Sequence, residues 1–247
     1  MTGYEETATA GVVTGGLPDD AVGPDLWFEL PPGFTPFRLD EDPESRMLRM
    51  AEATDVMFGV TATAEQKLSL IVSGEYVLQT MIAADAEHVS SCLVRMPDGE
   101  LSQATLCVLV ERPAAGPKHQ DRQSSAKRTA VQWRDLYPDA EVGLVMLPYG
   151  MTALCIRDQA ILIPGAVFGL GDPVPVTVRQ VQFCVPLRTG PGSALFVFTT
   201  QDTDPGHWSA YLDMFSGIMR SLSTDEPENE RRPGDRNPGA EGTERQT

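Results

Sequence analysis

The sequence predicts an α+β fold: a mainly antiparallel sheet of about six or seven strands, covered by helices in an α/β/α sandwich-like arrangement. Short β-rich segments joined by hairpin turns predict the sheet, and apolar segments with helical spacing lie between and after them. The chain has 247 residues, of which 41% are hydrophobic, enough for one sizeable core. We therefore expect one domain over residues 26–222, between acidic, disordered tails at 1–25 and 223–247.

The charge of the chain argues against two classes of function. Its 35 acidic and 19 basic residues give a net charge of −16, and Coulomb repulsion opposes binding to nucleic acid or to an anionic membrane. The sequence shows no secretory signal and no uninterrupted apolar stretch of about 18 residues. We expect a cytoplasmic protein that binds neither nucleic acid nor membrane.

The first third of the predicted domain combines a short strand with two helices. Leu26–Leu30 has the composition of a strand. Asp42 followed by Pro43 is typical of a helix start, because Asp caps free N–H groups and Pro suits the first turn. A second helix is predicted over 64–84, and its apolar arc is too wide for one buried stripe. This helix should therefore lie between the sheet and another element.

Two β-rich runs, 88–96 and 101–111, predict a hairpin whose turn contains Asp-Gly. If Pro97 pairs with Glu100, the two cysteines of this hairpin lie diagonally on one face of the sheet. No C-x-x-C spacing is present, and each cysteine lies in a strand-like run: Cys92, Cys107, Cys155 and Cys184. We therefore expect reduced, buried thiols and no metal site.

The second half of the chain continues the alternation of helices and strands. One helix is predicted from 122 to 136, and a last helix begins after Asp204-Pro205. Apolar residues of the last helix recur mostly at spacings of three and four: Trp208, Tyr211, Leu212, Phe215, Met219 and Leu222. The expected strands between these helices are 140–147, 152–157, 160–163, 176–187 and 193–200, with a long loop at 164–175.

No motif indicates a catalytic or cofactor-binding residue. The sequence has no G-x-S-x-G elbow, and its clustered carboxylates precede helices, where capping explains them. The glycines of 165–171 are followed by Asp-Pro-Val-Pro, so no helix N-terminus is available to bind a phosphate. We expect no cofactor and a protein that is not an enzyme. The alternative is a small-molecule enzyme whose site lies beneath the loop at 164–175.

Two surface patches are candidates for binding a partner protein. The first is rich in methionine, whose unbranched side chain suits an adaptable groove; its candidates are Met47, Leu48 and Met50. The second is a basic helix surface with the candidates Arg122, Lys127 and Arg128. Ordinary core packing is the alternative for the first patch, and a solvated helix face for the second.

Motifs at both ends of the predicted domain resemble the Mog1/PsbP-like superfamily of small α/β/α sandwich proteins. The opening Phe28-Glu29-Leu30-Pro31-Pro32-Gly33-Phe34 is similar to that of actinobacterial members. The closing resemblance lies in Val185-Pro186-Leu187, in 194–200 and in 208–222, which ends in Met-Arg-Ser-Leu. This sequence differs by an extra helical segment near 41–85 and by lacking a lipoprotein signal. The resemblance implies a binding or assembly factor and supplies no catalytic residue.

These observations favour a non-enzymatic cytoplasmic binding, adaptor or assembly protein with a protein partner. The resemblance suggests an actinobacterial protein linked to a bacterial secretion or toxin-associated system. Besides the enzyme, a structural subunit of a homo-oligomer is the other alternative. An enclosed pocket with perturbed titratable groups would favour the enzyme, whereas a contiguous exposed apolar patch would favour the binding protein.

Overall fold

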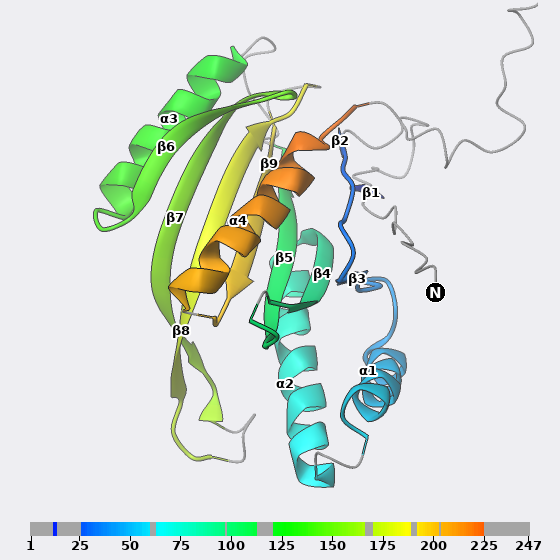
Figure 1. Cartoon of the computed structure of the whole chain (residues 1–247). Helices are drawn as coiled ribbons and strands as arrows, with labels where there is room; N and C mark the ends of the chain where they lie inside the picture. The colour runs from blue at the N-terminus through cyan, green and yellow to red at the C-terminus, as the bar shows by residue number, and fades with distance from the viewer. Residues whose placement is uncertain are drawn as a thin grey trace, which may run out of the picture.

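The computed structural model describes residues 12–13, 26–59, 63–96, 98–112, 121–165, 170–188, 192–202 and 204–224. Its centre is a seven-stranded antiparallel sheet (Figure 1), with the spatial order β3 (Phe34–Pro36), β4 (Ala86–Arg95), β5 (Leu101–Glu111), β9 (Ser193–Thr200), β8 (Val174–Pro186), β7 (Gly150–Ile163) and β6 (Glu141–Leu147). The described helices are α1 (Pro43–Phe58), α2 (Ala64–Ala83), α3 (Arg122–Leu136) and α4 (Pro205–Arg220). A separate two-stranded sheet pairs β1 (Val12–Val13) with β2 (Leu26–Trp27).

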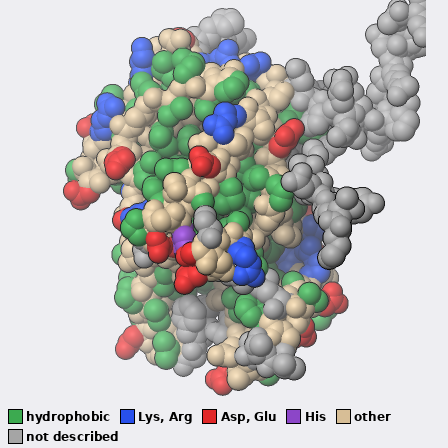
Figure 2. Space-filling model, viewed as in Figure 1, with side chains coloured by type: hydrophobic (Ala, Val, Ile, Leu, Met, Phe, Trp, Pro, Cys, Tyr) green, Lys and Arg blue, Asp and Glu red, His purple; other side chains and the backbone are tan. Residues whose placement is uncertain are grey.

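One face of the large sheet packs against α4, and the main hydrophobic core lies between them (Figure 1). Phe196 and Phe198 of β9 point to this face, and Phe215 of α4 stacks on Phe198 with ring centroids 3.9 Å apart. The N-terminal segment extends the cover, because Phe28 meets Phe196 edge to face. Beside α4, hydrophobic side chains on the surface are interspersed with acidic and basic ones (Figure 2).

On the opposite face of the sheet, helices pack near both edges. Helix α2 lies behind β4, and α1 packs on α2. Helix α3 lies against β7 and β6, with its buried Ala130 beside Ala153. Helices therefore cover both faces of an antiparallel sheet, which confirms the predicted α+β, sandwich-like fold.

The β4–β5 hairpin forms with a register one residue away from the expected one. The Met96 N–H donates to the Glu100 carbonyl at 2.7 Å, so three residues form the turn, and Gly99 adopts a φ of 93°. Cys92 consequently pairs with Ala104. A shift of one residue reverses the face of every later side chain. Cys92 therefore belongs to the α4-side core and Cys107 to the α2-side cluster, and the prediction that they share a face is wrong.

Three other predicted strands differ in extent. The runs 152–157 and 160–163 form a single strand, β7, paired with β8 along its length from Ala153 to Ile163. The strand expected at Leu26–Leu30 is only the two-residue β2, outside the large sheet. Within the predicted tail at 1–25, Val12–Val13 form β1; the rest of that tail and residues 225–247 lie outside the described residues.

The burial of the cysteines agrees with the prediction from the sequence. All four cysteines are buried free thiols, and burial raises the pKa of Cys92 and of Cys107 to about 11. Among the described residues, no helix is both long enough and apolar enough to cross a bilayer.

Candidate functional site

Helix α2 is covered less completely than its composition predicts. Its C-terminal half packs on the sheet through Leu78, in one cluster with Val89 and Cys107. Its N-terminal half packs on α1, where Met50 lies against Gly74. Residues 74 and 78 are about one helical turn apart, so the sheet and α1 occupy the same side of the helix. Both expected neighbours are present, but they do not enclose α2 from two sides.

The other side of α2 carries exposed apolar side chains. Leu68, Val72 and Tyr76 are 61%, 39% and 40% exposed, and their spacing of four residues places them in one row. Leu70 and Val77 are 44% and 37% exposed, but at about 100° per residue they lie on the opposite flank of the helix from this row. We call Leu68, Val72 and Tyr76 the α2 face. Several large apolar side chains exposed together on one helix are typical of a surface that another protein covers.

The hydroxyl groups beside the α2 face bond to the helix itself. Ser73 Oγ donates to the Leu70 carbonyl at 3.0 Å, and Thr80 Oγ1 donates to the Tyr76 carbonyl at 2.9 Å. These donors therefore keep a partner when water is excluded, so covering the α2 face leaves neither of them unsatisfied.

The α2 face is also nearly free of charge. Helix α2 has three charged residues, Glu65, Lys67 and Glu75. Lys67 Nζ donates to Asp55 Oδ1 of α1 at 2.7 Å and to the Gly59 carbonyl at 2.6 Å. Glu75 is 7% exposed and also binds α1, which leaves Glu65 at the beginning of the helix.

A buried ion pair between Arg46 and Glu75 joins α1 to α2. The Arg46 guanidinium donates through Nε to Oε2 at 3.2 Å and through Nη2 to Oε1 at 2.7 Å. Burial opposes ionisation of Glu75, but hydrogen bonds from Arg46 and Gln79 outweigh it and lower the pKa of the carboxyl group. The hairpin of α1 and α2 is therefore held partly by a polar contact with defined geometry.

The methionine-rich candidates on α1 do not form one surface. Met47 and Met50 are half-buried, and Met50 packs in the cluster beneath α2. Leu48 is 62% exposed and is not part of that cluster. The core alternative thus describes Met50, while Leu48 is the member of the group most open to a partner.

The basic candidates all lie on α3. Arg122, Lys127 and Arg128 are exposed, whereas Ala126 and Ala130 form the buried side of the helix. This exposure fits both a solvated helix face and a docking surface. Binding of a partner by these three residues stays a prediction.

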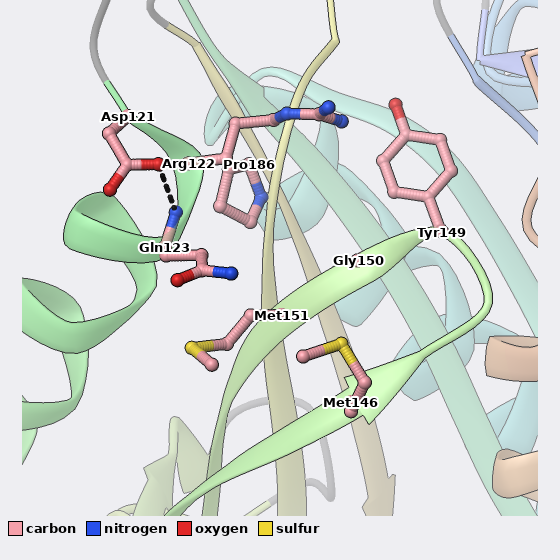
Figure 3. A pocket seen from close by; sticks show the side chains of 8 residues that line it. All are labelled: Asp121, Arg122, Gln123, Met146, Tyr149, Gly150, Met151 and Pro186. Atoms are coloured by element: carbon pink, nitrogen blue, oxygen red, sulfur yellow. Dashed lines mark hydrogen bonds between the residues drawn. The ribbon is translucent and has the colours of Figure 1, made fainter.

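A small open pocket of about 240 Å³ lies at the start of α3 (Figure 3). It is lined by Asp121, Arg122, Gln123, Met146, Tyr149, Gly150, Met151 and Pro186. Its acidic group is already engaged, because the Asp121 carboxylate caps α3 by accepting hydrogen bonds from Gln123 N and Ser124 N. The pocket is also smaller than the roughly 300–1,000 Å³ usual for ligand sites.

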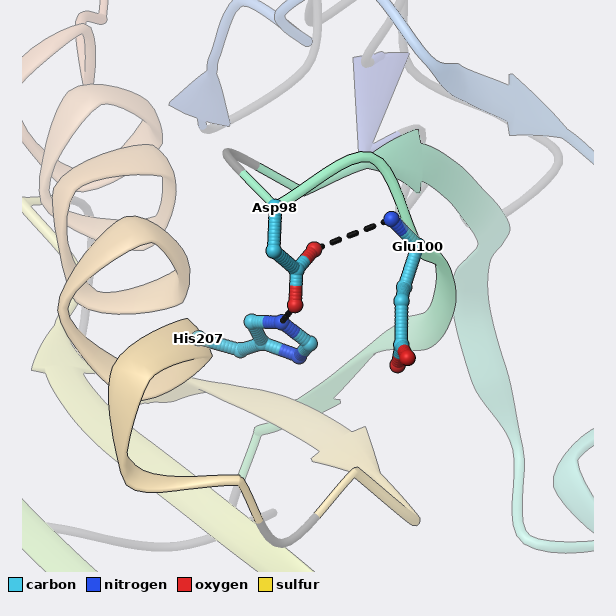
Figure 4. A group of neighbouring side chains, drawn as sticks. All are labelled: Asp98, Glu100 and His207. Atoms are coloured by element: carbon cyan, nitrogen blue, oxygen red, sulfur yellow. Dashed lines mark hydrogen bonds and ion pairs between the residues drawn. The ribbon is translucent and has the colours of Figure 1, made fainter.

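A second cluster of titratable groups lies at the start of α4 (Figure 4). His207 is 5% exposed and bridges two carboxylates, of which Figure 4 shows Asp98. Its Nδ1 is 2.7 Å from Asp202 Oδ2, and its Nε2 is 2.8 Å from Asp98 Oδ2 in the β4–β5 turn. Hydrogen bonds to Asp98 and Asp202 raise the pKa of His207 to about 9, so the ring is an imidazolium at neutral pH.

This charge state limits the chemistry of the cluster. An imidazolium cannot accept a proton as a general base. Ser102 Oγ bonds to Asp202 and, at 2.5 Å, to the Tyr211 hydroxyl, so the carboxylate separates this hydroxyl from His207. The order of contacts is therefore not that of a Ser-His-Asp triad.

The same cluster contains potential metal ligands. Among the described residues, ligand atoms of Asp98, Glu100 and His207 lie within 4.8 Å of one another. A cation would have to displace the proton on Nε2, and the imidazolium already neutralises one of the two carboxylate charges of Asp98 and Asp202. The arrangement fits an ion-paired clamp between the β4–β5 turn and α4.

Comparison with known proteins adds little to this description. No protein-family model matches the sequence, and no curated protein matches it. A solved structure from Bacteroides thetaiotaomicron VPI-5482 is similar over 84% of this chain and 47% of its own, at 9% identity and a TM-score of 0.34. This chain thus spans less than half of that protein, and so low a TM-score supports no argument about function.

Neither the α2 face nor the His207 cluster was predicted from the sequence. The α2 face had a signal, the wide apolar arc at 64–84, but the pattern did not show which part of that arc the sheet would leave open. The His207 cluster had no local signal, because Asp98 lies 109 residues earlier in the chain.

Proposed function

We propose that this protein is a non-enzymatic binding or assembly protein that docks another protein chain on the α2 face. The observation that carries this proposal is the exposure of Leu68, Val72 and Tyr76 in one row on a nearly uncharged helix side. Apolar surface gains about 25 cal/mol per Å² when it leaves water, so a complementary chain stabilises this face by covering it. The Mog1/PsbP-like resemblance supports the same class of function.

Site-specific photo-crosslinking in cells tests the proposal. A photoreactive amino acid replaces Tyr76, and a matched control carries it at Val131 on α3, which is 53% exposed. We expect a discrete protein adduct from position 76 and none of the same mass from position 131. Val72→Glu places a charge in the apolar row, so adding this substitution should abolish the adduct. The protein should stay folded, because Val72 is 39% exposed. An adduct insensitive to Val72→Glu, or none at position 76, would contradict the proposal.

Two finer assignments stay predictions from the sequence. They are the cytoplasmic compartment and the link to a bacterial secretion or toxin-associated system. The enzyme alternative also stays a prediction, since residues 166–169 of the loop at 164–175 lie outside the described residues.

A further inference from the structure

We infer that the acidic segment 225–230 of this chain docks against Arg122 and Arg188, in the small pocket at the start of α3. This surface lies on different elements from the α2 face, so the inference goes beyond the proposed function and does not depend on it. It depends on the position of Thr224, on the two cations nearby and on the residues that line the pocket.

The last described residue before this segment, Thr224, lies close to the pocket. The chain is held there by Trp27 and Ser223, whose backbone N–H groups each donate to the other's carbonyl, at 2.8 and 2.9 Å. Arg188 Nη1 donates to Thr224 Oγ1 at 3.4 Å. The same guanidinium lies 4.8 Å from the centre of the Tyr149 ring, which lines the pocket. Because an extended chain advances about 3.3–3.6 Å per residue, the first residues of the segment can reach the pocket.

Two cations lie at this end of the molecule. Arg122 and Arg188 are exposed, and the Arg122 side chain extends toward Tyr149 (Figure 3). Within the described ranges, neither guanidinium forms an ion pair with a carboxylate. The acid that lines the pocket does not supply such a pair, because Asp121 caps α3 instead. Both cations can therefore take an anionic chain.

The segment has the complementary charge. Its sequence is Asp-Glu-Pro-Glu-Asn-Glu, which has four carboxylates in six residues, and the basic pair Arg231 and Arg232 follows it. Pro227 offers an apolar ring to Met146 and Met151, which line the same pocket. The pocket volume of about 240 Å³ is small for a free ligand, but it admits one side chain of this size.

The docked state should be reversible. Exposed ion pairs are individually weak and are screened by salt. A short tether offsets this weakness, because it holds the segment at an effective concentration in the millimolar range. When docked, the segment covers Arg122, so an acidic partner that uses this arginine must first displace it.

Paramagnetic relaxation in the full chain tests the inference. A nitroxide attached to Asn229→Cys labels one site, because the four native cysteines are at most 8% exposed. We expect it to broaden the amide signals of Gln123 and Gly150, but not that of Leu136, which is about 20 Å farther along α3. The matched control replaces each carboxylate of the segment by its amide: Asp225→Asn, Glu226→Gln, Glu228→Gln and Glu230→Gln. This control, or about 0.5 M NaCl, should reduce the broadening about threefold or more.

Exchanging the charges distinguishes docking on these arginines from the proximity that the tether alone creates. Arg122→Glu with Arg188→Glu should abolish the broadening, and adding Glu226→Arg with Glu228→Arg should restore it. If the arginine variant does not fold, the amide control, which leaves the described domain unchanged, still decides.

Two results would overturn the inference. Broadening that persists in the amide control would show proximity alone. No broadening at Gln123 in the otherwise unaltered chain would leave the two arginines to an acidic partner. Neither result bears on the proposed function, which crosslinking from position 76 on α2 tests separately.

Discussion

Helices α2 and α4 are both rich in apolar residues, yet they relate to the sheet in different ways. Helix α4 lies across the sheet and buries Tyr211, Phe215 and Met219 to 1% exposure or less. Helix α2 is longer, with 20 residues against 16, but Leu78 is its one apolar side chain in the fully buried core. When a helix has more apolar side chains than its own chain buries, the side chains that stay exposed mark a surface for another chain.

The two helices also differ in what attaches them. Aromatic stacking holds α4, with Phe215 between Phe198 and Tyr211. Helix α2 is attached largely through α1, by the Arg46–Glu75 pair and the Lys67 contacts. We therefore expect α4 to carry global stability and the hairpin of α1 and α2 to respond more locally.

The largest expected effect is that of Phe215→Ala in α4. Phe215 is 1% exposed, so its truncation should lower the free energy of unfolding by about 3–5 kcal/mol through lost burial and a cavity. The matched change in α2, Tyr76→Ala, removes a side chain that is 40% exposed and should cost under about 1 kcal/mol in the monomer. Chemical denaturation at low protein concentration measures both. Equal losses would show that α2 belongs to the core as fully as α4.

Breaking the ion pair between α1 and α2 should have the next largest effect. Arg46→Ala leaves the Glu75 carboxylate buried without its partner, which typically costs about 3–5 kcal/mol. Replacing both residues, as Arg46→Met with Glu75→Leu, removes the uncompensated charge and should recover most of that loss. Hydrogen exchange of the α1 and α2 amides in the single and double variants provides the measurement, because this hairpin is expected to open locally. A loss below about 1 kcal/mol for Arg46→Ala would mean that the pair contributes little to the attachment of α2.

The His207 clamp should give α4 a stability that depends on pH. Its folded-state pKa of about 9 is above the unfolded value of 6.5, so its contribution is complete below pH 6.5. That contribution declines as pH rises from 6.5 to 9 and is lost above this range. The melting temperature of the wild type should therefore exceed that of His207→Gln clearly at pH 6 and only slightly at pH 10. A difference that is constant with pH would show that the ring is held by packing and not by its two carboxylates.

The α4 half of this comparison could be predicted from the sequence, because its signals are local. Asp204-Pro205 gives the start of the helix, and the Tyr211, Phe215 and Met219 spacing gives its buried side. The β4–β5 register could not be predicted from the Asp-Gly signal alone. That dipeptide fits both a two-residue and a three-residue turn, and the choice between them reverses the face of Cys107.

The burial of α2 could be predicted only in part, because the assembled fold decides which side chains of a helix are buried. The sequence shows the apolar width of α2, whereas the sheet edge and α1 decide which residues of that arc remain open. The ion pair of Arg46 with Glu75 and the contact of Asp98 with His207 join residues 29 and 109 positions apart, and no spacing rule brings such residues together.

The smallest expected effects come from the helix caps, and they test whether α2 opens separately from the sheet. Thr63 Oγ1 accepts from Gln66 N at 3.2 Å in a capping box for α2, and Asp204 Oδ1 accepts from Gly206 N at 2.6 Å at the start of α4. Thr63→Ala and Asp204→Ala should each cost about 1 kcal/mol of helix stability.

The two cap variants should differ in which measurement detects the loss of helix stability. If α2 opens locally, Thr63→Ala accelerates hydrogen exchange of the α2 amides about fivefold and leaves the melting temperature of the sheet almost unchanged. Asp204→Ala should instead lower the melting temperature, because α4 unfolds together with the core. An equal fall in melting temperature for both variants would contradict the comparison. It would show that α2, α4 and the sheet unfold as one cooperative unit, so that the open side of α2 is held as rigidly as the buried side of α4.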